Sequence, residues 1–80
     1  MAKPKNDLYK TSDLYLSAFL RTAGGNQIKH EREENRVYFY FEDIEGAIPR
    51  LREDFYNGRA KVSALDYANM VRSQKSILHS

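Results

Sequence analysis

Apolar residues near the start of the chain recur with the period of a helix. They are spaced i, i+3, i+4 and i+7, and they are Leu16, Phe19, Leu20 and Ala23. Thr11 or Ser12 can cap such a helix, and Asp13 then lies in the first turn, where the helix dipole favours a carboxylate. Gly24-Gly25 supplies a left-handed stop. We expect this helix to lie at the centre of the core.

The stretch RVYFYFED, which begins at Arg36, places five apolar or aromatic residues in a row. Together with the residues before it, this stretch predicts two strands, 26–32 and 36–42, joined by a tight turn. Asn35 is the residue of the turn that best tolerates the left-handed conformation required there. The sequence therefore predicts a β-hairpin in the middle of the chain.

Alternate residues of a strand face opposite sides of the sheet, so the second strand has two different faces. One face is entirely hydrocarbon and consists of Val37, Phe39 and Phe41. Tyr38 and Tyr40 lie on the other face, and a tyrosine can pack its ring against a neighbour while its hydroxyl reaches water. We expect the hydrocarbon face to pack on the helices and the two tyrosines to form an outward aromatic ledge.

A second helix is predicted over residues 43–57, with Gly58 as its stop. Its apolar stripe consists of Ile44, Ile48, Leu51 and Phe55. Gly46 and Pro49 weaken its beginning, because proline is tolerated only in the first turn of a helix. The regular part is therefore expected to start near Gly46 or to be kinked there.

A third helix is predicted to follow Ser63. Ser63 and Asp66 make a capping-box pattern, and Val62 and Tyr67 occupy the positions of a hydrophobic staple. The residues expected to share its inward face are Ala64, Tyr67, Ala68, Val71 and Leu78. Gln74 is a polar interruption of this face.

These elements predict a single α+β domain over residues 9–80, with the order helix, β-hairpin, helix, helix (αββαα). Residues 1–8 hold charges of mixed sign, a proline and one large apolar side chain, which predicts a flexible N-terminal arm. The chain has no cysteine, so packing has to stabilise it without a disulfide or a thiolate metal site. Without an apolar run near the roughly 18 residues of a membrane span, or a signal-peptide segment, we expect a cytoplasmic protein with no membrane partner.

The net charge of +2 combines two regions of opposite sign. Residues 31–54 carry eight acidic residues against four arginines, and the rest of the chain carries nine basic residues against three aspartates. Two poles of this kind suit a surface that binds a partner. Solvated faces give the same count, however, so both explanations stay open.

The segments YKTSDLYLSAFL, RVYFYFED and DFYNGRAKVSALDYANMVRSQKSIL together resemble a family of small bacterial and phage domains of unknown function. Members of that family open with a YKTSDLYLAAFL-like signature and end with a tyrosine-bearing helix followed by L-K-S. Ser17 stands where alanine is usual, and Gln74-Lys75-Ser76 stands in place of L-K-S. The resemblance implies a prokaryotic or mobile-element accessory protein and carries no activity.

The sequence does not predict an enzyme. His30 and His79 are the only histidines, and H-E-R-E-E does not have the H-E-x-x-H spacing of a metal site. Gly24-Gly25 lacks the further glycines and the lysine of a phosphate-binding loop. We therefore expect no catalytic residue, no metal, no cofactor and no small-molecule substrate.

Two kinds of binding function stay open. The first is protein–protein interaction through Tyr38 and Tyr40, either with another protein or as a homodimer through the hairpin, since exposed contiguous aromatics are typical of interfaces. The second is weak binding of DNA or RNA by a basic C-terminal half, in which the tyrosines stack on bases. The basic residues of this second hypothesis are Arg59, Lys61, Arg72 and Lys75. The small net charge favours protein–protein interaction.

Overall fold

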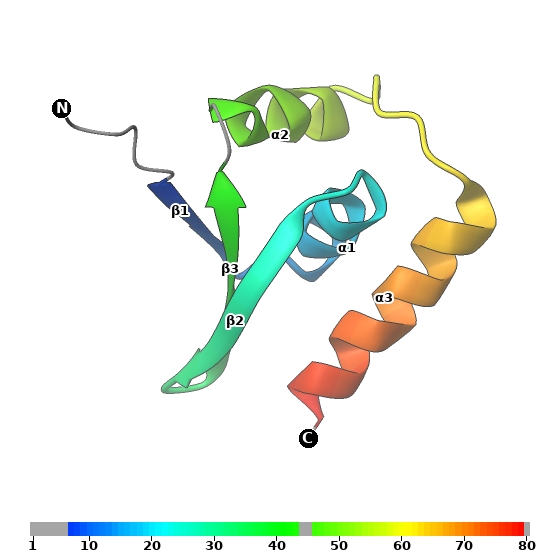
Figure 1. Ribbon diagram of the computed structural model, residues 1–80. Coiled ribbons are helices and arrows are strands. Elements are labelled where there is room, and N and C mark those ends of the chain that lie inside the picture. The colour runs from blue at the N-terminus through cyan, green and yellow to red at the C-terminus, as the bar shows by residue number, and fades with distance from the viewer. Residues whose placement is uncertain (1–6, 44–45, 80) are drawn as a thin grey trace, which may run out of the picture.

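A computed structural model describes residues 7–43 and 46–79 of the chain. Its elements are β1 (Asp7–Thr11), α1 (Leu14–Thr22), β2 (Asn26–Glu33), β3 (Arg36–Asp43), α2 (Ile48–Tyr56) and α3 (Ala64–Leu78). The strands form one antiparallel sheet in the order β1-β3-β2, and Figure 1 shows the three helices grouped around α1. The predicted α+β class and the order helix, hairpin, helix, helix are confirmed, with one further strand in front.

Strand β1 corrects two predictions about the N-terminal part of the chain. Asp7 and Leu8 were expected in a flexible arm, but they begin a strand that pairs with β3 from Asp7↔Asp43 to Thr11↔Phe39. The first six residues of the predicted arm lie outside the described part. Thr11 ends this strand, so the cap of α1 is Asp13, whose carboxylate accepts the backbone N–H groups of Tyr15 and Leu16. Backbone hydrogen bonds to β3 hold β1 in place, and a segment with one large apolar residue gave no local sign of them.

The predicted hairpin is confirmed, with a difference at its turn. Glu34, and not Asn35, takes the left-handed conformation, with a φ of 57°. The first central position of this two-residue turn needs a positive φ, and the turn register places Glu34 there. A bulge between Gln27 and Lys29 shifts the β2–β3 register, and Ile28 is exposed. Because β1 occupies its other side, β3 is the central strand.

The sheet packs on α1 through the face that its alternation predicted. The buried apolar residues of this core are Leu16, Phe19, Leu20, Val37, Phe39, Phe41 and Ile48. Burying a side chain of this kind stabilises the fold by about 1.5–3 kcal/mol. The hydrocarbon face of β3 is therefore inward, as expected.

Helix α1 ends at the predicted glycine pair. Gly24 has a φ of 96°, and its N–H donates to the carbonyl of Arg21. The backbone N–H of Gly25 donates to the carbonyl oxygen of Leu20 at 2.7 Å, so close that a Cβ on residue 25 would meet this oxygen at 2.7 Å. The chain can therefore turn directly into β2 only with glycine at this position.

Helix α2 is shorter than predicted. Asp43 stays in β3 and accepts the backbone N–H of Ile48 with its Oδ1 at 2.9 Å, so the helix begins at Ile48 with Pro49 in its first turn. The predicted Ile44 lies outside the described residues. The rest of the stripe is confirmed: Ile48 is buried, Leu51 packs against the core, and Phe55 stacks on Phe19 with ring centroids 5.3 Å apart.

Helix α3 begins as predicted, with the Ser63 hydroxyl accepting the N–H of Asp66. Its inward face differs from the prediction, since Ala64 and Ala68 are exposed. Gln74, expected as an interruption, is fully buried at 0% exposure. The helix is therefore rotated so that a glutamine faces α1.

The buried amide of Gln74 is held by three partners. Its Nε2 donates to the Ser17 hydroxyl at 2.9 Å and to Gln27 Oε1 at 2.8 Å, and its Oε1 accepts from Arg21 Nη1 at 3.0 Å. This network satisfies the polar atoms that α3 brings into the interior. It also joins α3 to both α1 and β2.

Candidate binding face on the outer side of the sheet

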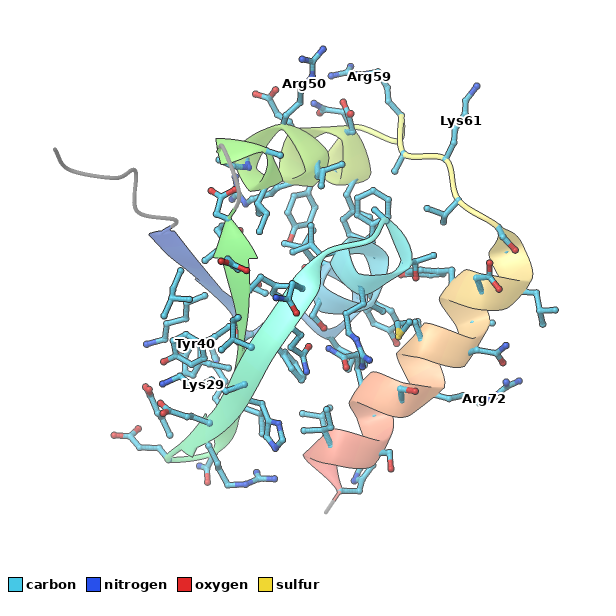
Figure 2. The ribbon with its side chains drawn as sticks, viewed as in Figure 1. Lys29, Tyr40, Arg50, Arg59, Lys61 and Arg72 are labelled. Atoms are coloured by element: carbon cyan, nitrogen blue, oxygen red, sulfur yellow. The ribbon has the colours of Figure 1, made fainter. Side chains whose placement is uncertain are left out.

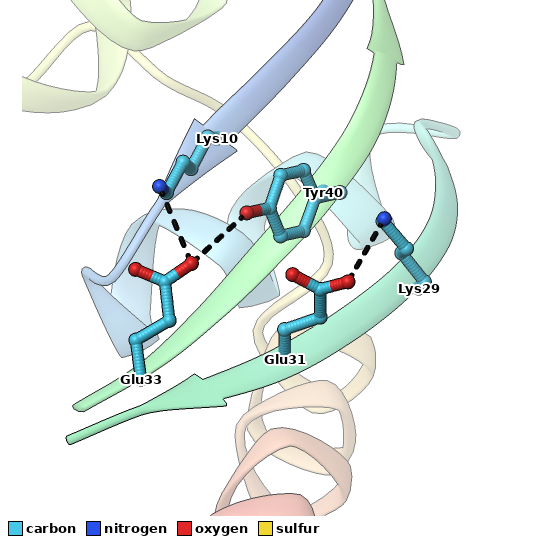
Figure 3. Close-up of polar contacts among 5 residues, drawn as sticks. All are labelled: Lys10, Lys29, Glu31, Glu33 and Tyr40. Atoms are coloured by element: carbon cyan, nitrogen blue, oxygen red, sulfur yellow. Dashed lines mark hydrogen bonds and ion pairs between the residues drawn. The ribbon is translucent and has the colours of Figure 1, made fainter. Parts of the chain in front are cut away.

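The sheet face turned away from α1 is the candidate functional site. The strand registers place Leu8 and Lys10 of β1, and Lys29, Glu31 and Glu33 of β2, on the same side as the tyrosines of β3. We call this surface the outer face; its residues are Leu8, Lys10, Lys29, Glu31, Glu33, Tyr38, Tyr40 and Glu42. Figure 3 shows part of it, with the helices behind the strands. Within the described residues, no helix packs on the outer face.

Tyr38 and Tyr40 point outward as predicted, but lysine side chains partly cover them. Lys10 Nζ lies 4.4 Å from the centre of the Tyr38 ring and 5.8 Å from that of Tyr40. Lys29 Nζ lies 4.8 Å from the centre of the Tyr40 ring on the other side. Both tyrosines are half-buried. The predicted bare aromatic ledge is thus a pair of phenol rings flanked by two cations.

Each lysine of the outer face is also paired with a glutamate. Lys29 Nζ is 3.0 Å from Glu31 Oε2, and Lys10 Nζ is 3.5 Å from Glu33 Oε2, which also accepts the Tyr40 hydroxyl at 3.5 Å. Figure 3 shows these contacts around Tyr40. Positive and negative charges therefore alternate across the face, and the rings lie between them.

The pairing moves the pKa values of these groups away from neutrality. The hydrogen bond and charge of Lys29 lower the pKa of Glu31, and the same pair raises the pKa of Lys29. For Lys10, desolvation lowers the pKa, but Glu33 and Tyr40 outweigh this effect and raise it overall. The lysines stay protonated and Glu31 stays ionised near pH 7, so this arrangement suits binding and not proton transfer.

The basic residues of the nucleic-acid hypothesis lie elsewhere. Figure 2 shows Arg59 and Lys61 beyond α2 and Arg72 on α3, whereas Tyr40 and Lys29 lie at the other side of the molecule. Arg59 Nε is 3.6 Å from Asp54 Oδ1, and Arg72 donates to Asn69 at 2.7 Å. Lys75 lies in the last turn of α3, where a cation complements the helix dipole. The structure does not bring the two tyrosines together with these four cations.

Sequence reasoning missed two features of the surface. Lys10, Lys29 and the two glutamates were not predicted to surround the tyrosines, because β1 was not recognised as a strand. The second feature is a hollow of about 230 Å³, which we call the α2–α3 hollow. It is lined by Phe19, Phe55, Gly58, Ala60, Val62 and Tyr67. The staple pattern of Val62 and Tyr67 was its only sign in the sequence.

Other chemistry was searched for in the same part of the chain. Among residues 7–43 and 46–79 there is no group of three or more histidine, aspartate or glutamate side chains that could hold a metal ion. His30 and His79 are both exposed. None of the described helices is long and apolar enough to span a bilayer.

Comparison with known proteins gives one family. A family model described as "Domain of unknown function (DUF5659)" matches residues 6–80. Neither the curated proteins nor the solved structures gave a match. The matched range contains the whole described fold, including β1.

Proposed function

The chain belongs to this family of unknown function, DUF5659, and from that premise we propose that it is a non-enzymatic binding domain. It acts by protein–protein interaction, and the outer face holds the partner. We further propose that it serves as an accessory protein of a bacterium or of a mobile element and works in the cytoplasm. The origin rests on the resemblance of its opening YKTSDLYLSAFL to small bacterial and phage domains.

The observation that supports this proposal is the composition of the outer face. Two half-buried tyrosines lie side by side on the central strand, with no described helix over them. Tyrosine is enriched at protein interfaces because it offers a large ring and a polar hydroxyl at a low entropy cost. The flanking Lys10–Glu33 and Lys29–Glu31 pairs can orient a partner that carries complementary charges.

A separate protein fits this face better than a second copy added to the hairpin edge. Strand β1 occupies one side of β3, so the hairpin offers only the outer edge of β2. That edge carries KHERE, residues 29–33, and consecutive charged side chains oppose edge-to-edge pairing. The homodimer through the hairpin stays an untested prediction, and the charge of β2 argues against it.

Nucleic-acid binding is the second candidate function. It is favoured by Arg50, Arg59 and Lys61, which project from the same side of the molecule in Figure 2. Glu53 and Asp54 lie in the same region and reduce its positive potential. With the four cations of the hypothesis, about four phosphate contacts give a log-log salt slope near −3.6 on duplex, so such binding is weak at physiological salt.

The experiment compares three forms of the chain as bait for a protein partner. The wild type, the Tyr38→Ser/Tyr40→Ser double variant and a Tyr15→Ser control are immobilised, and the retained protein is identified and then titrated as a purified component. Tyr15 is an exposed tyrosine on α1, away from the outer face. We expect the double variant to bind at least about tenfold more weakly and the control to match the wild type.

Three results would contradict the proposal. The first is equal affinity of the double variant and the wild type for the purified partner. The second is unfolding of the double variant, which would mean that the tyrosines are part of the core. The third is binding of single- or double-stranded oligonucleotide with a salt slope near −3.6, lost in Arg59→Ala/Lys61→Ala but not in the tyrosine variant.

A further inference from the structure

The α2–α3 hollow is an apolar depression that the chain does not fill. The ring of Phe19 lies at α1, Phe55 and Tyr67 come from the helices on either side, and Val62 belongs to the connection between them. Its volume is about 230 Å³. A cavity of about 150 Å³ already holds a benzene-sized group, so this hollow can take one large aliphatic or aromatic side chain.

Leu65 is an apolar side chain of the right kind on the neighbouring surface. It is 69% exposed, the highest value among the exposed large apolar residues of the described chain. It lies in the first turn of α3, three residues after Val62, which lines the hollow and is itself exposed. Ala64 and Ala68, on the same exposed part of α3, are small enough to let another helix approach closely. The hollow and an unburied leucine are thus neighbours on one surface.

We propose that two copies of the chain associate about a two-fold axis at the start of α3, with Leu65 of each copy seated in the α2–α3 hollow of the other. A two-fold interface is self-complementary, so residue i of one copy contacts residue j of its partner, and j contacts i. An anchor and a receptor that lie this close in one copy can both sit near such an axis. Each association then buries two leucines and fills two hollows.

The charges around the hollow fit a second copy. The adjoining hollow, which shares Phe19, Ala60 and Val62 with it, is bordered by two bases and two acids: Asp54, Arg59, Lys61 and Asp66. The rim therefore has no net charge, and an identical rim turned by the two-fold axis can place bases opposite acids. A nucleic acid, with one sign of charge, does not match this rim.

This association leaves the outer face of the sheet free. Figure 1 shows the start of α3 on one side of the molecule and the strands β1 and β3 on the other. The dimer therefore does not depend on the binding function proposed for the outer face. A dimer would instead present two outer faces to its partners.

The first experiment is sedimentation equilibrium of the pure full chain over a range of concentrations. The wild type, Leu65→Ser and a matched Leu8→Ser control are compared; Leu8 is 55% exposed and lies on the outer face. We expect the wild-type mass to rise toward that of two chains, and Leu65→Ser to raise the dissociation constant at least about tenfold. The control should dimerise like the wild type. Both leucines are exposed, so neither variant should lower the urea midpoint.

Three outcomes of this experiment overturn the proposal. They are a wild type that stays monomeric at every concentration, a Leu65→Ser variant that dimerises as well as the wild type, and a Leu8→Ser control that loses dimerisation. The last outcome would place the contact on the sheet. None of them tests the outer face, because no other protein is present.

A second experiment locates the contact, using the fact that the chain has no cysteine. A Leu65→Cys chain is mixed with a Val62→Cys chain under mild oxidation, and a mixture with Ile28→Cys serves as control. We expect a disulfide between positions 65 and 62 of different copies, in excess of that formed with the exposed Ile28→Cys. Equal yields in the two mixtures would contradict the seating of Leu65 in the hollow.

Discussion

Helix α1 is packed on two sides, and the two sides are held by different kinds of contact. Toward the sheet, Leu16, Phe19 and Leu20 belong to a core of hydrocarbon and phenyl groups. Toward α3, Ser17 and Arg21 are hydrogen-bonded to the buried Gln74. The first side is stabilised by the area it removes from water, and the second by the direction of a few hydrogen bonds.

This difference shows what each kind of contact specifies. An apolar core tolerates changes in detail if volume is kept, whereas a buried amide needs partners at defined positions. Gln74 bonds to α1 and β2 at once, so it specifies where α3 lies along both. The apolar side of α1 supplies most of the stability, and the polar side defines the placement of α3.

The largest effect is expected on the apolar side. Phe39 is fully buried, and Phe39→Ala should lower the free energy of unfolding by about 3–5 kcal/mol. A chain of this length is stable by roughly 4–12 kcal/mol, so much or all of the stability would be lost. Urea unfolding followed by circular dichroism measures this, with Arg36→Ala as an exposed control on the same strand. A loss below about 1 kcal/mol would show that β3 does not form the core.

A smaller effect is expected on the polar side. Gln74→Ala leaves Ser17 and Gln27 without their amide partner and should cost about 1–3 kcal/mol. Hydrogen exchange should show faster exchange of α3 amides and little change in β3, because α3 can detach without unfolding the sheet. Ser73→Ala, next to Gln74 and exposed, is the control. Equal acceleration in α3 and β3 would mean that the two sides of α1 unfold as one unit.

The smallest effect concerns the contact that joins α2 to the start of α1. The Tyr56 hydroxyl donates a hydrogen bond to the Asp13 carboxylate, which with partial burial and the Asp13 charge raises the pKa of Tyr56 to about 12. A raised folded-state pKa means that the stabilisation is fully present below the unfolded value near 10 and is lost as pH rises toward 12. Tyr56 is 53% exposed, so solvent limits its size.

The test of this contact compares the wild type with Tyr56→Phe. The urea midpoint of the wild type should exceed that of the variant below pH 10, and the two should converge between pH 10 and pH 12. The ultraviolet absorbance of tyrosinate gives the titration directly. A midpoint difference that does not change with pH, or a Tyr56 that titrates like a free tyrosine, would contradict the assigned hydrogen bond.

The sequence by itself determined the elements whose signals are local. Period-two alternation assigned Phe39 inward and Tyr40 outward, and helical spacing located the core side of α1. Gly24 and Ser63 marked a helix end and a helix start, because a stop and a cap depend on residues within one turn of them. The outward direction of the two tyrosines, on which the candidate site depends, was predictable for the same reason.

The tertiary structure alone decided the features that need a distant partner. Strand β1 forms because its backbone pairs with β3, more than thirty residues away, and Lys10 reaches the tyrosines only through that pairing. Asp43 leaves α2 because β3 retains it, and Gln74 is buried because Ser17, Arg21 and Gln27 converge on it. Hydrogen bonds between segments far apart in the chain leave no periodic pattern in either segment, so no local reading of the sequence could have found them.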